Sequence, residues 1–380
     1  METSAVTPRE RLLAVIAGKV PDTVPIFLRG VSPFGDKMNW MGAFDPSYQI
    51  LRDLAYEKTD IFHPIGLDTG VFLSAGGPEI GACVVYEDAD WRDVESKIDT
   101  PKGPITSVTR SSRHNLYEVM TTEFFIESED DLASFMSIPY QPVRCEVEAV
   151  MNQKDKEVGE RGVPVVSIPS AIGLAYGLLG SEGLAIWSAL RREPLVGLVR
   201  ELGRRVLDYV GWLLQHGAGP VFSWGGAELA LPPLMSPDDF HTLVTEVDTP
   251  VHELIHQHSH YTWVHCHGGV GVVLDEFLKM GVDMLEPVEA PPGGDILLSE
   301  AKRRAAGRIV LMGNMPYEAL ISWEPSRIEE KVKADCQAAM EGGGFIMMPA
   351  ASPFEPVLTD RGFEGYRTYV EAGRKYGRYT

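Results

Sequence analysis

The chain has few cysteines, no long hydrophobic run and no excess of positive charge. Its four cysteines are scattered over 380 residues without a Cys-x-x-Cys pair, so we expect reduced thiols and no disulfide framework. No apolar stretch approaches the roughly 20 residues needed to span a bilayer, and residues 1–11 carry charges instead of an apolar signal core. A net charge of −20 disfavours nucleic acid and anionic membranes as partners. We therefore expect a cytoplasmic protein that binds neither.

The composition is that of an ordinary soluble enzyme. Hydrophobic residues make up 44% of the chain and charged residues 23%, which excludes extensive disorder. A chain of this length can form one large α/β domain or two smaller ones. We predict a single domain over residues 1–380, interrupted by an insertion at residues 70–138.

Eight short apolar runs end in glycine, proline or a polar residue, and most are separated by segments long enough for a helix. This βα pattern predicts strands at residues 24–28, 60–65, 163–168, 220–224, 262–267, 284–287, 309–313 and 345–348. Eight parallel strands alternating with helices predict an α/β fold of the (β/α)8 TIM-barrel type, with the active site at the carboxyl ends of the strands. A doubly wound sheet is the alternative.

The predicted insertion breaks this rhythm. Residues 105–109 and 118–126 have the pattern of a β-hairpin around a polar turn. We expect this hairpin to lie over the barrel mouth, as a structural cover or as a contact between subunits.

The segment Trp263-Val264-His265-Cys266-His267-Gly268-Gly269 is a buried strand that ends in two imidazoles. Strand alternation points His265 and His267 to one face and Cys266 to the other. Two nitrogens on one face suit a metal ion, and a carboxylate from a neighbouring strand would complete a His2Glu zinc set. Glu228 and Glu286 lie on the two neighbouring predicted strands, and either of them could be that carboxylate. The alternative is a pair of hydrogen-bonded histidines.

Polar residues follow most of the other predicted strands and should converge in one pocket. Each of them alone has an ordinary structural explanation, such as an ion pair, a buried hydrogen bond or a helix cap. The candidates for catalysis are Arg29, His63, Asp68, Glu228 and Asn314, those for substrate binding are Tyr176, Trp224 and Glu289, and those for a metal are His265, His267 and Glu286.

Two further patterns are interpreted as structural. His252, His256, His258 and His260 precede the central strand, so we expect a solvated cluster away from the site. The glycines at 342–344 lack a following helix N-terminus and predict a tight turn instead of a phosphate site.

Several segments, in the same order along the chain, carry a resemblance to a known family. They are residues 8–18, the hairpin after residues 100–103, residues 127–132, residues 234–240, the strand of His265, residues 311–314 and residues 375–379. In these segments the chain resembles the uroporphyrinogen decarboxylase-like superfamily, which includes methyltransferases that move methyl groups between corrinoid proteins and thiol or folate acceptors. The resemblance implies a distorted (β/α)8 barrel.

The resemblance also implies where this chain departs from its relatives. In the zinc methyltransferases of the family the fifth strand ends in His-x-Cys-Gly, and a second cysteine follows the last strand. Here His267 occupies the cysteine position and residues 350–351 are both alanine, so the two-thiolate site cannot form. The change favours a harder metal environment and a carboxylate, methoxy or hydroxyl-bearing substrate over an acceptor thiol.

The decarboxylases of the family bind a tetrapyrrole with an arginine pair, an aspartate, a tyrosine and a late histidine. Only Arg29 of the arginine pair is present, Asp68 and Tyr176 match loosely, and no histidine follows His267. We therefore do not expect porphyrinogen decarboxylation.

The resemblance implies a methyltransferase component of a corrinoid-dependent demethylation system. It would bind a small methyl donor or acceptor, with zinc as the candidate metal and a corrinoid (methylcobalamin) supplied by a partner protein. A decarboxylase or other lyase, and a non-catalytic binding protein, are the alternatives. A homodimer is one assembly that the sequence allows.

Overall fold

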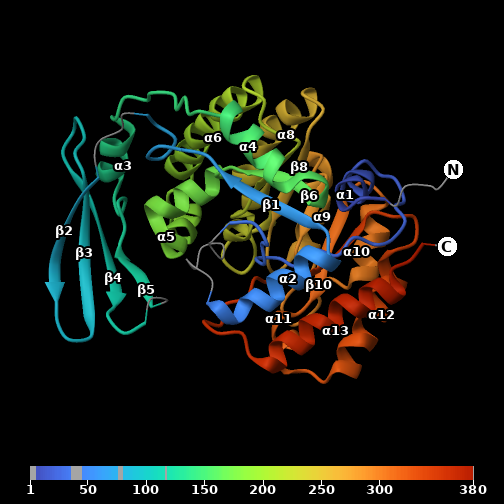
Figure 1. Ribbon diagram of the computed structural model, residues 1–380. Coiled ribbons are helices and arrows are strands. Elements are labelled where there is room, and N and C mark those ends of the chain that lie inside the picture. The colour runs from blue at the N-terminus through green and yellow to red at the C-terminus, as the bar shows by residue number, and fades with distance from the viewer. Residues whose placement is uncertain (1–5, 36–44, 76–79, 116–117, 380) are drawn as a thin grey trace.

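The structure, a computed structural model, describes residues 6–35, 45–75, 80–115 and 118–379. Its centre is a parallel sheet of seven strands in the order β1-β6-β7-β8-β9-β10-β11 (Figure 1). The strands are β1 (Ile61–Gly66), β6 (Gly162–Ser167), β7 (Val221–Trp224), β8 (Tyr261–His265), β9 (Met284–Glu286), β10 (Val310–Met315) and β11 (Phe345–Pro349). Each matches one of the predicted strands.

The first predicted strand, residues 24–28, is reduced to a single parallel bridge between Ile26 and Met347 of β11. Phe27 N donates to Met347 O at 2.9 Å, and Asp60 N, just before β1, donates to Ile26 O at 2.8 Å. The segment therefore connects the two edge strands and closes the TIM-type barrel. Pro25 has no N–H group to donate, which limits the length of this ladder.

The protein has two apolar cores, one inside the barrel and one between the barrel and its outer helices. The inner core contains Phe27, Phe62, Val165, Trp263 and other inward-facing strand residues. Leu12, Val15 and Ile16 of α1 (Pro8–Ile16) belong to the same cluster, so α1 closes the amino-terminal end of the barrel. The space that remains inside the barrel lies at the carboxyl ends of the strands.

The larger core packs the outer faces of the strands against the helices. These helices are α2 (Gln49–Lys58), α3 (Glu129–Met136), α4 (Glu148–Val158), α5 (Ala171–Leu190), α6 (Arg192–Gln215), α7 (Pro237–Phe240), α8 (Glu246–Gln257), α9 (Val270–Met280), α10 (Leu298–Ala305), α11 (Tyr317–Ser322), α12 (Pro325–Ala339) and α13 (Asp360–Tyr376). No helix within the described ranges is both long enough and apolar enough to cross a membrane.

The insertion is larger than the predicted hairpin. It forms a four-stranded antiparallel sheet of β2 (Ile80–Glu87), β3 (Trp91–Ile98), β4 (Ile105–Ser112) and β5 (Val119–Glu123), in sequential order. The predicted hairpin corresponds to β4 and β5, but β2 and β3 were not expected. All eight residues of β2 are exposed, so the strand lacks the alternation of buried and exposed positions on which such a prediction depends. Figure 1 shows the sheet at one side of the molecule, beyond α5.

Two of the structural predictions have different outcomes. Residues 342–344 form the turn into β11, as expected. The histidine cluster is not uniformly solvated: His252 is fully buried, and its Nδ1 lies 2.9 Å from Thr262 Oγ1. Burial, followed by the charge of His256, lowers the pKa of His252 to about 3.

Candidate active site

The ends of β8 and β9 bring His265 and Glu286 side by side, because these two residues are partners in the parallel register. His265 Nδ1 lies 2.9 Å from Glu286 Oε1. Arg29, which follows the closing segment, donates from its guanidinium to the same carboxylate oxygen across 257 residues of sequence. Glu286 thus binds a cation and an imidazole at once.

Glu286 is held as an anion inside the protein. Only 1% of its side chain is exposed, whereas Arg29 is 23% and His265 is 21% exposed. Burial acts to raise the pKa of Glu286, but the charges of Arg29 and His265 and their hydrogen bonds outweigh it and lower that pKa to about 2. The buried carboxylate therefore orients two partly accessible groups.

Arg29, His265 and Glu286 line a cavity of about 350 Å³. Its floor is formed by the aromatic rings of Phe27, Phe62 and Trp263. Each of these residues lies two positions before another lining residue on the same segment, and therefore one layer deeper in the barrel. The Trp263 ring centroid is 5.9 Å from that of Phe27 and 5.0 Å from that of Phe62. An apolar floor with a few charged and hydroxyl groups is typical of a small-molecule site.

The hydroxyl groups of the cavity come from serines that the sequence did not identify. Ser167 ends β6 and Ser223 lies on β7, and both line the cavity. Strand alternation from the inward-facing Val165 and Val221 places both serines on the inner face, so the signal was present in the sequence.

His267 belongs to a second, adjacent cleft of about 350 Å³, which Glu228 and Glu289 also line. His267 Nδ1 lies 3.0 Å from Glu289 Oε2, and Gly268 N donates to the same oxygen at 3.2 Å. The rings of His265 and His267 are 4.6 Å apart between centroids and nearly perpendicular. The two histidines therefore separate two clefts, and each has its own carboxylate.

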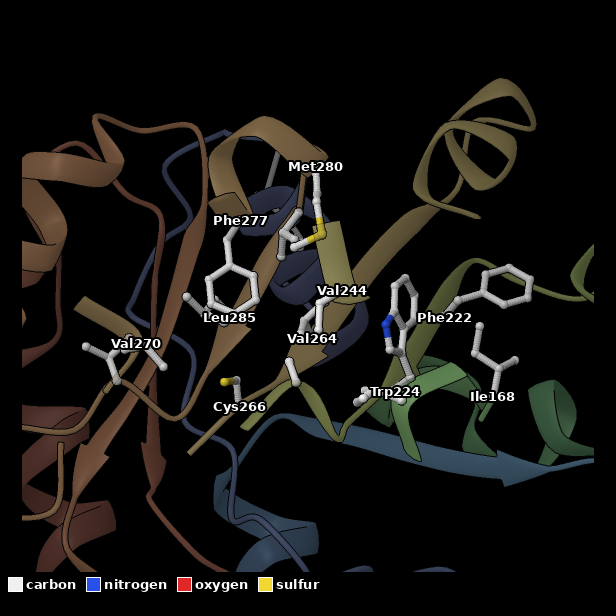
Figure 2. Close-up of a cluster of buried hydrophobic side chains, with 14 of the residues drawn as sticks. Ile168, Phe222, Trp224, Val244, Val264, Cys266, Val270, Phe277, Met280 and Leu285 are labelled. Atoms are coloured by element: carbon white, nitrogen blue, oxygen red, sulfur yellow. The ribbon is translucent and has the colours of Figure 1, made fainter. Parts of the chain in front are cut away.

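Cys266 points away from both clefts, as the alternation predicts. It is fully buried among Val264, Val270, Phe277 and Leu285 (Figure 2). Burial, and then the nearby carboxylates, raise the pKa of its thiol well above the ordinary range. The protonated, enclosed thiol is unsuited to act as a nucleophile.

Four of the predicted site residues do not line either cleft. His63 lies on β1 between the cavity residues Phe62 and Pro64 and points the opposite way, with Nδ1 3.2 Å from Ser32 Oγ. Asn314 accepts a 2.6 Å hydrogen bond from Lys331 of α12, outside the barrel.

The other two lie on the surface. Asp68 is exposed and accepts from Gly70 N at 2.9 Å, and Tyr176 of α5 is 44% exposed. The prediction that these four side chains converge in the pocket was therefore wrong. It used only their positions after strands in the sequence, and such a position does not determine where a side chain points.

The remaining predicted residues lie at the clefts. Trp224 is among the residues that line the main cavity, but its ring packs in the outer core, 4.6 Å from the ring of His252, and its Nε1 donates to the buried Asp248 of α8 at 3.1 Å. Glu228 lies in the short helix Ala227–Ala230, and its Oε2 accepts from Gly226 N at 3.2 Å. Glu228 is therefore beside His267 and away from the Arg29–Glu286 pair.

The donor set does not fit the predicted three-ligand zinc site. Within the described ranges, no three His, Cys, Asp or Glu side chains are grouped in a way that would hold a metal ion. Glu286 is neutralised by Arg29, and the two histidine Nδ1 atoms contact different carboxylates. A zinc set needs its ligands to converge on one point.

We accordingly expect protein purified without a histidine tag to contain far less than one zinc per chain. Elemental analysis of the wild type and of His265→Ala and His267→Ala variants checks this. Near-stoichiometric zinc that is lost in both variants would contradict the expectation and restore the metal site.

The pair of His267 and Glu289 predicts a defined pH dependence. The hydrogen bond to Glu289 is the main cause that raises the pKa of His267, and burial opposes it. The contribution of the pair to stability is complete below the unfolded pKa of about 6.5 and is lost as pH rises through the folded pKa. We expect the difference in Tm between wild type and Glu289→Gln to be present at pH 6 and to disappear at pH 9. An NMR titration of the His267 ring should show a pKa that falls in the variant, and a pH-independent Tm difference would contradict the assignment.

Comparisons with known proteins agree with this architecture. A methyltransferase from Methanosarcina mazei matches with 18% identity and a TM-score of 0.59, covering 97% of this chain and 99% of that chain. The 3-keto-D-glucoside 4-epimerase YcjR from E. coli matches with 10% identity and a TM-score of 0.31, over 59% of this chain and 92% of that chain. The first of these likenesses supports the barrel fold, and the second is too low to support an argument. No curated protein sequence matches the chain.

The sequence itself identifies the family. The profile of uroporphyrinogen decarboxylase (URO-D) matches residues 148–376, more than half of the chain. This region begins with α4, includes the strands β6 to β11 and ends with α13, so it contains His265, His267, Glu286 and Glu289. The chain belongs to the uroporphyrinogen decarboxylase family.

Proposed function

We propose that this protein is a methyltransferase that removes a methyl group from a small substrate bound in the main cavity and passes it to a corrinoid on a partner protein. The observation that carries the proposal is the Arg29–Glu286–His265 group above an aromatic floor. The methyltransferase from Methanosarcina mazei, which shares the fold over nearly the whole chain, supports the reaction class.

The chemistry requires a nucleophilic acceptor and a stabilised leaving group. A corrinoid carried by the partner would supply the acceptor. The methyl group leaves without the electron pair of its bond to oxygen or nitrogen, so that pair stays on the leaving atom and must be neutralised by a proton or a nearby positive charge. In this site the protein's task is to bind the donor and provide that charge.

His265 and Arg29 are the groups that suit this task. The contact of Glu286 with Nδ1 of His265 orients the ring and favours a proton on that nitrogen, which leaves the other ring nitrogen available to exchange a proton with the donor. Arg29 provides a permanent cation, held by the same carboxylate. The aromatic floor binds the apolar part of the donor and excludes water below it.

A carboxy-lyase is the alternative, and Arg29 is the feature that favours it because a guanidinium binds carboxylates well. In that reaction Arg29 would bind a carboxylate of the substrate, and a carboxylate of the protein would have to stabilise a cationic intermediate. Asp68, the residue predicted for this role, is exposed and does not line the cavity. The arrangement therefore supports methyl transfer better.

Methyl transfer is tested by incubating the protein with reduced corrinoid protein and a panel of methoxylated and N-methylated donors. We expect the absorbance of the reduced corrinoid to be replaced by that of methylcobalamin with at least one donor, and His265→Ala to suppress this change. Decarboxylation of uroporphyrinogen, or tight binding of a donor without turnover, would overturn the proposal in favour of a lyase or a binding protein.

A further inference from the structure

The structure contains another cavity at the amino-terminal end of the barrel, opposite the candidate active site. It has a volume of about 280 Å³, and its lining includes Ile26 of the closing segment, Asp60 just before β1, and residues of α1 and α13. Phe27 and Phe62, which form the floor of the main cavity, come later on the same two segments. They therefore lie between the two cavities, and the cavity at the amino-terminal end is separate from the site described above.

Positive charge predominates in the lining of this cavity, which we call the basic cavity. Its cationic lining residues are Arg11, Lys58, Arg161, Arg374 and Arg378. Its acidic lining residues are Asp22, Glu57 and Asp60, so two positive charges are in excess, although the whole chain carries a net charge of −20. A hollow that concentrates charge of one sign attracts ligands of the opposite sign. The basic cavity therefore favours an anion.

Most of these cations are not neutralised by the acids of the cavity. Arg11 donates to the two oxygens of Asp22 at 2.7 and 2.8 Å and to Asp60 at 2.7 Å, so this one arginine binds two of the three carboxylates. Lys58, Arg374 and Arg378 are exposed and form no ion pair with any residue that the structure describes. These three side chains therefore retain N–H groups for a bound anion.

Arg161 gives a second, independent observation. Its Nη2 donates to the backbone carbonyls of Tyr56 and Thr59, which holds the guanidinium at the wall of the cavity. Its Nε is buried and has no hydrogen-bond partner among the described residues. Buried N–H groups in proteins are almost always paired with the protein, with water or with a ligand. Arg161 therefore has a buried donor that an acceptor from outside the chain can satisfy.

We propose that the basic cavity binds a small oxyanion with the chemistry of phosphate, either as a free anion or as the phosphate group of a metabolite. Guanidinium groups bind phosphate oxygens through paired N–H donors, and four of the five cations are arginines. The cations come from the end of α2, from the turn Gly159–Arg161, from α13 and from the segment after α13. A bound anion would join these distant segments and stabilise the closed barrel. The proposal does not depend on the proposed methyl transfer.

Thermal unfolding and isothermal titration calorimetry of the full chain test this proposal. The ligands are inorganic phosphate, pyrophosphate and ribose 5-phosphate, each at constant ionic strength. A ligand that binds only the folded state raises the Tm, and we expect a rise of about 2 °C with at least one of them at tenfold excess over its Kd. The ligand that binds most tightly distinguishes a free anion from a phosphorylated metabolite.

Three variants assign the binding to this cavity. Arg374→Gln and Arg378→Gln should each raise the Kd by about 10-fold, because each removes a charged donor. Arg367→Gln is the matched control: Arg367 also lies on α13 and is 46% exposed, but it contacts Glu364 and Glu371 and does not line the cavity, so its Kd should equal that of the wild type. The Tm of each variant without ligand shows whether the fold is retained. Absence of binding by all three ligands, or an equal rise in Tm in Arg378→Gln and the wild type, would overturn the proposal.

Discussion

Replacing Glu286 by Gln should reduce methyl transfer by about 100- to 1000-fold, because the neutral amide neither forms the ion pair that holds Arg29 nor keeps the carboxylate contact that orients His265. The same change should lower the free energy of unfolding by about 3 kcal/mol, since it leaves the Arg29 cation without its buried partner. Single-turnover kinetics and urea unfolding measure the two effects. Unchanged activity would show that Glu286 has only a structural role.

The double variant Arg29→Met/Glu286→Leu separates stability from activity. Removal of both charges eliminates the unpaired group, so much of the lost stability should return, whereas activity should not. If the double variant is as unstable as Glu286→Gln, the loss comes from packing and the ion-pair explanation is wrong.

Protonation of Glu286 at low pH should also make the wild type and Glu286→Gln differ in acid unfolding. Its folded pKa of about 2 is below the ordinary value of 4.5, so its stabilisation is present above pH 4.5 and is lost as pH falls toward 2. Acid unfolding of the wild type should therefore be steeper in this range than that of Glu286→Gln. Parallel unfolding curves would contradict the assigned charge.

The second large effect is expected at the floor of the cavity. Trp263→Ala should lower the free energy of unfolding by about 3–5 kcal/mol, because Trp263 is 7% exposed and packs against Phe27 and Phe62. Its Nε1 makes no hydrogen bond within the described part of the chain, so the cost arises from packing. The variant should also raise the KM for the methyl donor.

Trp263→Phe is the matched control, because it retains a ring at the floor. We expect a smaller loss of stability, about 1–2 kcal/mol, and a smaller rise in KM. An unchanged KM in Trp263→Ala, measured at a temperature where the variant is folded, would show that the donor does not contact the floor.

The sequence predicted the barrel because periodicity and strand order are local signals. Eight apolar runs indicated the barrel, and the order of the strands left both Glu228 and Glu286 as carboxylates near His265; the register of β8 and β9 in the structure pairs His265 with Glu286. The alternation along β8 also predicted that Cys266 points away. These conclusions follow from the order of the strands and from the two-residue alternation of side chains along a strand.

Other parts of the site depend on information that the sequence pattern does not contain. The pairing of Arg29 with Glu286 joins residues 257 positions apart and depends on closure of the barrel. His63 lies on the face of β1 that is buried against the outer layer, together with Ile61 and Ile65, but a polar residue in a short apolar run does not by itself show which face is inward. The separate carboxylates of His265 and His267 appear only once Glu286 and Glu289 are positioned in space.

A stopped-flow comparison of methyl transfer to reduced corrinoid protein by the wild type, Glu286→Gln and Glu289→Gln tests the proposed role of Glu286. We expect rapid formation of methylcobalamin by the wild type, a rate at least 100-fold lower for Glu286→Gln, and a much smaller loss for Glu289→Gln, which alters the adjacent cleft. No methyl transfer by the wild type with any donor, or a greater loss in Glu289→Gln than in Glu286→Gln, would contradict this expectation.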